Sequence, residues 1–351
     1  MKIYLDAFLA NNFGDDLFVD ILLKRYPNHN FIAISNGIVY NRYSNLKVFS
    51  NSFFYRVMKK FKLDKLIANR CDLIVTIGGS MYIENTGVKQ DFNLGKNKRY
   101  ILGANFGPYK SELFKENVKE LFKNTEDVCL RDLYSYNMFK ELTNVRYAPD
   151  IIFGLDNANV KVTNRKRAII SVISCNYKFK ENLNDFTDTY IEEKYEEKII
   201  ELIKYLQSKE YEICLMSFCK EQNDEEAIES ILKKCDEDTK NRIEKYYYTG
   251  DIAEALNVIG DSRLIIGSRF HANIIGMVLG KTVIPMYYSD KTKNVIEDMN
   301  IDIKAVDIRD IQNFDINSIN DEDLTRVIDI SGLKRDAKNQ FNELDKVLLT
   351  R

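Results

Sequence analysis

One stretch constrains the fold of this chain more than any other: residues 264–277 have the pattern of a short strand, a tight turn and a helix. The strand, residues 264–266, is fully apolar, which is typical of a strand buried on both faces of a parallel sheet. A Gly-Ser turn follows, and Arg269 and His271 then open the helix. Open α/β sheets bind their ligands at the carboxyl ends of their strands. The stretch therefore predicts an α/β fold with a ligand site at this turn.

Two side chains of this stretch carry chemistry. The guanidinium of Arg269 can form paired hydrogen bonds with a phosphate or a carboxylate, and the start of a helix adds free backbone N–H groups and a positive dipole end. His271 can move a proton near neutral pH. The alternative is that Arg269 is a surface cation and His271 a hydrogen-bonded residue at a helix cap. The pattern alone leaves both interpretations open.

Size and charge narrow the class of protein. The chain has 351 residues, a length that favours two domains over a single core. Its content of 45% apolar and 30% charged residues is typical of a soluble globular protein. The 51 basic and 53 acidic residues nearly balance, so the net charge of −2 gives no reason to expect nucleic acid as a partner.

The sequence shows neither a targeting signal nor a metal motif. The N-terminus enters a strand pattern at once, so we expect no signal peptide, and no run of about 18 apolar residues predicts a membrane span. The 6 cysteines are scattered, mostly within apolar runs, without metal-binding spacing. We therefore expect buried thiols in a reducing cytoplasm and no metal, while peripheral association with a membrane is left open.

Apolar strands alternate with helices in both halves of the chain, which predicts two Rossmann-like domains whose strand ends face a cleft. The polar segment 156–167 separates the halves. We predict an N-terminal domain at residues 1–157, a C-terminal domain at 165–318, and a mostly helical tail at 319–351 that packs across the domains.

Two loops of the N-terminal half follow apolar strands and are rich in glycine. Such loops allow a ligand to approach the backbone, and they serve equally well as plain turns. The residues concerned are Asn12, Gly14 and Asp15 in the first loop and Gly78, Gly79 and Ser80 in the second.

Charged residues end further strands. Arg131 should either pair with Asp132 or another acid or point into the cleft, and Ser135 should point the same way from the next helix. Asp150 should orient a basic residue, bond a hydroxyl group or cap a turn. Lys291 follows the strand after the 264–277 unit and offers a further cation. Each residue alone has a structural explanation, but their shared position at strand ends favours a site.

Taken in order, these pieces resemble the polysaccharide pyruvyl transferase family from about residue 3 to residue 300. The order and spacing of the pieces carry the resemblance. The family commonly has leucine where this chain has Phe270, a mild change that bears on the shape of the donor pocket. The matching pieces are Asn12-x-Gly14-Asp15, Gly78-Gly79, Gly103 to Gly107-Pro108, Arg131-Asp132-x-x-Ser135, Pro149-Asp150, Ser268-Arg269-Phe270-His271, and Tyr288 with Lys291.

The resemblance implies a fold similar to that of GT-B glycosyltransferases. It implies transfer of the pyruvyl group of phosphoenolpyruvate to two hydroxyls of a sugar in a cell-surface polysaccharide or its precursor, forming a cyclic ketal. Arg131 and Arg269 are implied to bind the donor's phosphate and carboxylate, with His271 in acid–base work. Phosphoenolpyruvate would be a substrate, so no cofactor is expected, and the other partner would be a glycan or lipid-linked sugar acceptor. The residues expected to bind substrate are Asn12, Gly14, Asp15, Gly78, Gly79, Ser80, Ser135, Asp150, Ser268, Phe270 and Lys291.

Two other hypotheses remain at this stage. A GT-B glycosyltransferase with a nucleotide-sugar donor would use the same arginines to neutralise a diphosphate. A non-catalytic member of the family would bind a glycan or a partner without turnover. The sequence does not decide the acceptor, the oligomeric state or the closure of the domains.

Overall fold

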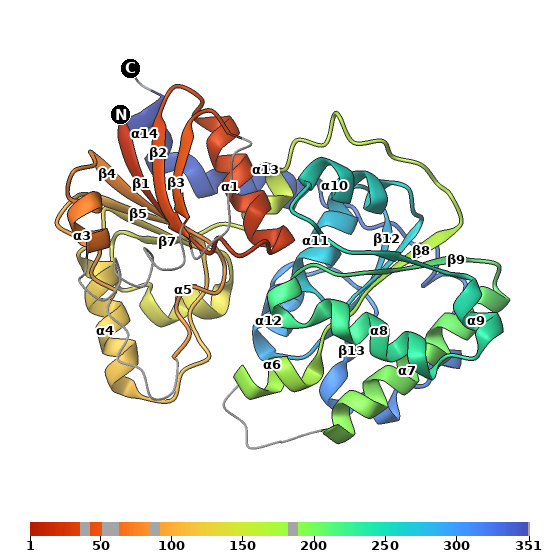
Figure 1. Ribbon diagram of the computed structural model, residues 1–351. Helices are drawn as coiled ribbons and strands as arrows, with labels where there is room; N and C mark the ends of the chain where they lie inside the picture. Colours follow the sequence, from red (N-terminus) through yellow and green to blue (C-terminus); the bar gives the residue numbers. More distant parts are fainter. Residues whose placement is uncertain (36–42, 51–62, 85–91, 182–188, 350–351) are drawn as a thin grey trace. The chain divides into compact units, whose positions relative to one another are not determined.

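The chain forms two compact units, which a computed structural model shows in Figure 1. Both units are parallel α/β sheets with helices, as the apolar strands predicted. The described residues are 1–35, 43–50, 63–84, 92–181 and 189–349. The first unit comprises Met1–Ala10, Asp15–Gly154 and Gly332–Arg351, and the second comprises Asn11–Gly14 and Leu155–Ser331.

The sheet of the first unit has seven parallel strands in the described residues, in the order β3-β2-β1-β4-β5-β6-β7. This is the Rossmann order: the chain adds β2 and β3 on one side of β1, then crosses back and adds β4 to β7 on the other side. Because all strands are parallel, their carboxyl ends lie along one edge. The strands are β1 Lys2–Ala7, β2 Asn30–Ser35, β3 Leu46–Ser50, β4 Leu73–Ile77, β5 Arg99–Ala104, β6 Asp127–Leu130 and β7 Val145–Tyr147.

The helices of the first unit follow the apolar spacing of the sequence. In α4 the buried residues are Phe114, Val118 and Phe122, four positions apart, and the Ser111 side chain caps the helix by accepting from the Phe114 N–H. The helices are α1 Phe13–Arg25, α3 Leu63–Ala68, α4 Glu112–Lys123, α5 Leu133–Phe139, α13 Ser331–Ala337 and α14 Asn342–Leu348, with 3₁₀ turns η1 Ile151–Gly154 and η5 Lys338–Phe341. The apolar spacing of residues 54–68 predicts one helix; α3 is its last part, and residues 54–62 lie outside the described residues.

A glutamine from the C-terminal segment is fully buried in the first unit. The Oε1 atom of Gln340 accepts from the Gly103 N–H at 2.9 Å, where the register between β5 and β6 shifts. Its Nε2 donates to the carbonyls of Ala148 and Pro149 at 2.8 and 3.1 Å. Every polar atom of this side chain is therefore used to join β5 to the end of β7.

Helix α14 adds an ion pair at the end of α1. Asp345 accepts from the Nε of Arg25 and from the Tyr26 hydroxyl, both at 2.8 Å. The ring of His29 lies 2.9 Å from the Leu348 carbonyl. Figure 1 shows α14 close to the N-terminus. The sequence predicted a tail over 319–351 that packs across the domains; in the structure residues up to Ser331 belong to the second unit and Gly332–Arg351 to the first.

The second unit repeats the design with six parallel strands in the described residues, ordered β10-β9-β8-β11-β12-β13. The strands are β8 Arg167–Ser171, β9 Glu212–Met216, β10 Ile243–Tyr246, β11 Leu264–Gly267, β12 Thr282–Tyr287 and β13 Val306–Asp307. The helices are α6 Cys175–Glu181, α7 Thr189–Ser208, α8 Asp224–Lys234, α9 Glu237–Asn241, α10 Ile252–Gly260, α11 Phe270–Val278 and α12 Asp290–Asp298, with 3₁₀ turns η2 Lys220–Gln222, η3 Ile308–Asn313 and η4 Ile316–Ser318.

Helix α11 lies close against the sheet because it contains a glycine. A Cβ atom at Gly276 would lie 2.8 Å from a side-chain carbon of Ile265 and 3.0 Å from one of Val283. At the other end of the helix, the Asn273 side chain donates to the Gly267 carbonyl at 2.9 Å. These contacts fix the turn between β11 and α11, which carries Arg269.

Several local predictions were wrong. The tyrosine run 246–248 indicates a strand, but β10 lies earlier, at Ile243–Tyr246, and the apolar spacing did not predict the short helices α6 and α9. Residues 321–325 form a turn rather than a helix. Val327 pairs with Thr282 in an isolated β-bridge, so the backbone is extended at Val327 rather than helical. The thiols behave as predicted, since all six cysteines are free and buried. No helix in the described residues is both long enough and apolar enough to span a membrane.

Candidate functional site

Arg269 lies at the carboxyl end of β11, and it is buried rather than on the surface. Its backbone N–H donates to the Ser171 hydroxyl at 3.1 Å. Its Nε donates to the Oδ2 of Asp224 at 2.9 Å, and its Nη2 donates to the other carboxylate oxygen. The guanidinium is thus held in a bidentate pair, the geometry that best fixes its orientation.

Asp224 completes this arrangement from the first residue of α8, where it is fully buried. Its Oδ2 also accepts from the N–H groups of Phe218 and Cys219, each at 2.9 Å. Burial lowers the pKa of Arg269, but the charge and hydrogen bonds of Asp224 outweigh burial and raise that pKa above its usual value. Arg269 therefore stays charged, and removing it would leave a buried carboxylate.

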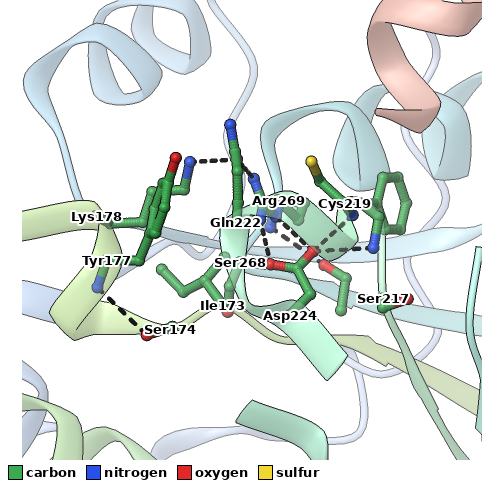
Figure 2. A network of polar contacts seen from close by, with 12 residues as sticks. Ile173, Ser174, Tyr177, Lys178, Ser217, Cys219, Gln222, Asp224, Ser268 and Arg269 are labelled. Carbon is green, nitrogen blue, oxygen red and sulfur yellow. Dashed lines mark hydrogen bonds and ion pairs between the residues drawn. The ribbon is translucent and has the colours of Figure 1, made fainter. Parts of the chain in front are cut away.

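A second cation lies in the same network, which Figure 2 shows. The Gln222 Oε1 atom accepts from the Nη1 of Arg269 and from the Nζ of Lys178, the latter at 2.5 Å. Lys178 comes from α6 and is buried. Two basic groups from different elements therefore converge on one neutral oxygen.

The remaining residues of the network hold the turn in place. The Ser268 hydroxyl lies 2.8 Å from the Tyr195 hydroxyl, which in turn accepts from the Ile173 N–H at 3.3 Å. Ser268 N–H donates to the Ser171 carbonyl at 3.0 Å. Burial raises the pKa of Tyr195 far above its usual value, so its hydroxyl keeps its proton. Ser268 is therefore buried in the scaffold of the site.

His271 lies over the loop that contains Gly14. An added Cβ atom at Gly14 would overlap the ring of His271, with its nearest atom, Nδ1, only 1.7 Å away. The rings of Phe270 and His271 meet edge to face, 5.1 Å apart. His271 is partly exposed, as is Phe270. Only glycine leaves room for the imidazole in this position.

Residues Asn11–Gly14 belong to the second unit, although they follow the first strand of the chain. The Phe13 ring packs between those of Phe218 and Tyr248, with centroids 5.2 and 4.9 Å away. Its N–H donates to the Phe218 carbonyl at 3.0 Å. The predicted loop is therefore divided: Asn12 and Gly14 lie in the second unit, and Asp15 lies in the first.

The Gly14→Ala variant should lose most of its turnover and still fold. The added methyl group must displace the His271 ring, because the two overlap. We expect kcat to fall by about tenfold or more, on the prediction that His271 is a general acid–base group, because such a group works only in a narrow geometry. Initial rates of product formation, with circular dichroism as the folding check, measure this.

Gly154→Ala is the matched control for this substitution. A Cβ atom there meets only the Ala337 side chain, at an ordinary 3.9 Å. Its kcat should match that of the wild type. An unchanged rate in Gly14→Ala would show that the ring position is not needed.

The first unit has its own buried pair at the carboxyl edge of its sheet. Arg131, after β6, is 2% exposed and donates from Nη1 to the Oδ2 of Asp150 at 2.7 Å. Its Nη2 donates to the Oδ1 of Asn105 at 3.1 Å. A Cβ atom at Gly79 would lie 2.2 Å from the guanidinium, so a side chain at this position would overlap Arg131. The sequence predicted that Arg131 either pairs with an acid or points into the cleft; in the structure it pairs with Asp150.

Ser135 has a structural position. Asp132 caps α5 by accepting from the Ser135 N–H at 2.7 Å, and it also accepts from the Ser135 hydroxyl at 2.9 Å. The same hydroxyl accepts from the Phe106 N–H at 2.8 Å. Ser135 is fully buried, and its hydroxyl links Asp132 to the Phe106 N–H, so its contact with a substrate stays a prediction.

The remaining predicted residues divide between the glycine loop and α12. Gly78 adopts a φ of +145° with the Asp15 carboxylate nearby, and Ser80 is exposed. Lys291 lies in α12, but its side chain is outside the part of the chain that the structure describes. Among the described residues, no group of three or more His, Cys, Asp or Glu side chains has the arrangement of a metal site.

The sequence shows a polar segment at 217–224 after a strand, which indicates polar contacts at the same edge as Arg269. It does not single out Gln222 and Asp224 within that segment, and it did not predict Lys178 as a site residue. No sequence pattern indicated Lys178, because the helix that carries it, α6, was not predicted. The Cys219 thiol is not a nucleophile near neutral pH, since burial raises its pKa to about 11.

Solved structures share this architecture. HepE from Anabaena, in complex with UDP, is 12% identical, with a TM-score of 0.54 and 100% of both chains covered. MnaA of S. aureus, solved with UDP, is 13% identical, with a TM-score of 0.62 over 99% of this chain and 95% of that one. A UDP-GlcNAc 2-epimerase of Methanocaldococcus jannaschii, in complex with UDP-GlcNAc and UDP, is 12% identical, with a TM-score of 0.52 over 98% and 99%. The chain therefore has a two-domain α/β fold of the GT-B type.

The family follows from the sequence match. The model of the polysaccharide pyruvyl transferase family matches residues 12–290, and the chain belongs to this family. It is accordingly a transferase. The matched range includes Gly14, Arg131, Asp150, Arg269 and His271.

Proposed function

We propose that this transferase moves the pyruvyl group of phosphoenolpyruvate onto a sugar of a cell-surface polysaccharide or its precursor and forms a cyclic ketal. The observation that carries the proposal is the turn after β11. There a buried arginine is held rigidly by Asp224, and a histidine lies two residues further along the chain. A fixed cation beside an acid–base group suits a donor with two anionic groups and an enol carbon that must be protonated.

The reaction balances with these groups. One sugar hydroxyl adds to C2 of the donor, and a proton reaches its methylene carbon to form the methyl group. The bond between C2 and the phosphate oxygen breaks, and a second hydroxyl completes the ketal as inorganic phosphate leaves with the remaining proton. His271 would carry one of these protons, and Arg269 would bind an anionic group of the donor. Lys291, Phe270 and the glycine loops remain predicted substrate contacts.

Calorimetric titration with phosphoenolpyruvate tests the donor. We expect saturable binding of phosphoenolpyruvate by the purified chain, and release of inorganic phosphate when a competent sugar acceptor is added. UDP, GDP and CMP are titrated in parallel and should not bind. Nucleotide binding without phosphoenolpyruvate binding would overturn the proposal.

A nucleotide-sugar glycosyltransferase is the second candidate. It is favoured by one observation: the similar structures of HepE and MnaA both hold UDP. In that reaction Arg269 would neutralise a diphosphate, and His271 would have no donor carbon to protonate. The same titration separates the two donors.

A further inference from the structure

Two buried cations converge on one neutral atom in the second unit. The side chains of Lys178 and Arg269 belong to residues only 5% and 7% exposed. Both donate to the Gln222 Oε1 atom, although they come from different elements, α6 and the end of β11. Figure 2 shows the amide between the two basic groups. We call Lys178 and Arg269 the cation pair.

An amide oxygen is a weaker partner for such a pair than an anionic oxygen. It carries only a partial negative charge, so it gives the two cations less charge attraction than a phosphate or carboxylate oxygen at the same distance would give. Burial also weakens the screening by water, so the repulsion between adjacent cations grows. A phosphate oxygen in the place of Gln222 Oε1 would accept the same two donors and would add charge attraction.

The two acceptors around Arg269 differ in how firmly they are held. Asp224 accepts from two backbone N–H groups as well as from the guanidinium, and it is fully buried. Gln222 is partly exposed and ends a three-residue 3₁₀ turn. Rotation of the Gln222 side chain toward solvent would remove this shared acceptor from both cations and leave the pair of Arg269 with Asp224 in place.

We propose that Lys178 and Arg269 together bind one phosphate-type oxyanion of the substrate, and that Gln222 Oε1 occupies the place of that oxyanion until the substrate displaces it. This deepens the proposed function, on which it rests: it adds Lys178 to the donor site and makes Gln222 a displaceable substitute for the ligand. An aromatic ring also stabilises the charge of Lys178, since its Nζ lies 5.8 Å from the Tyr288 ring centroid.

Substitutions at Gln222 should act in opposite directions. Gln222→Ala removes the competing oxygen and should tighten binding of inorganic phosphate by about two- to tenfold. Gln222→Glu supplies a permanent carboxylate to the cation pair, so it should weaken phosphate binding by about tenfold or more and raise the melting temperature. Lys178→Met should also weaken binding by about tenfold or more. Calorimetric titration at low salt measures all three.

A partly exposed lysine of the same unit provides the control. Lys198, in α7, pairs with Glu201 and is not part of the network, so Lys198→Met should bind phosphate as the wild type does. Equal losses in Gln222→Ala and Gln222→Glu, or wild-type affinity in Lys178→Met, would overturn the proposal. Circular dichroism and melting curves confirm that each variant folds.

Titration with phosphoenolpyruvate in the same variants separates this inference from the proposed function. If phosphoenolpyruvate binds the wild type and Lys178→Met equally, the function stands and the cation pair fails. If inorganic phosphate binds through Lys178 but phosphoenolpyruvate does not bind at all, the cation pair stands and the donor assignment fails.

Discussion

Replacement of Asp150 by alanine is expected to lower the free energy of unfolding by about 3–5 kcal/mol. Asp150 is fully buried, and its carboxylate accepts from Arg131 at 2.7 Å and from the Ile152 N–H at 2.9 Å. The variant would leave the charge of Arg131, itself 2% exposed, without this carboxylate. Removing one partner of a buried ion pair is strongly destabilising, because the remaining charge stays buried without its partner. Replacing both partners by apolar residues changes the free energy of unfolding much less.

Urea denaturation followed by circular dichroism measures the loss. The double variant Arg131→Met with Asp150→Leu should recover much of the stability, since both charges are then gone. Glu141→Ala, which removes an exposed partner of Lys119 in the same unit, should change stability far less. If Asp150→Ala unfolded like Glu141→Ala, the buried pair would have no structural role.

The His271→Ala variant is expected to reduce kcat by about 10²- to 10⁴-fold and leave the fold intact. The ring is partly exposed and lies against the backbone at Gly14, so its loss opens little space in the core. The rate of phosphate release from phosphoenolpyruvate, in the presence of an acceptor that the wild type uses, measures the effect.

His29→Ala is the matched control, because His29 is the other histidine in the chain. His29 lies between the N-terminal amine and the Leu348 carbonyl, so its loss should lower stability and leave kcat unchanged. Near-wild-type turnover in His271→Ala would remove the histidine from the mechanism.

Arg269→Ala is a less selective test than the sequence suggested. From sequence, Arg269 was either a cation that binds a ligand or a cation on the surface. The structure places Arg269 in a buried bidentate pair with Asp224, so its removal affects folding as well as binding. Lys178 and Gln222 allow the anion site to be tested without breaking that pair.

The architecture could be predicted because its signals are local. Runs of apolar residues between helices indicate parallel strands, and the α7 face with Tyr195, Ile199 and Leu202 is buried as its spacing predicted. The positions of Arg131 and Arg269 at strand ends follow from the same pattern. Because the strands of each sheet are parallel, their carboxyl ends lie at one edge, and these residues are grouped there.

The partners of these residues could not be predicted in the same way. Asp224 pairs with Arg269 across 45 positions of the chain, and no periodicity relates residues so far apart. The division of the first loop has the same cause. Phe13 packs on Phe218 and Tyr248, and a single apolar residue in a polar loop does not reveal which apolar surface it covers.

The buried position of Gln340 also sets an order of events during synthesis. Its side chain bonds to the carbonyls of Ala148 and Pro149, which precede it by 192 and 191 positions. The strands of the first unit therefore leave the ribosome long before the segment that completes them is made. The second unit lies between, nearly continuous in the chain from Leu155 to Ser331. We expect the later-made unit to finish folding first, and the earlier-made strands to wait for Gln340 as the last piece of their core.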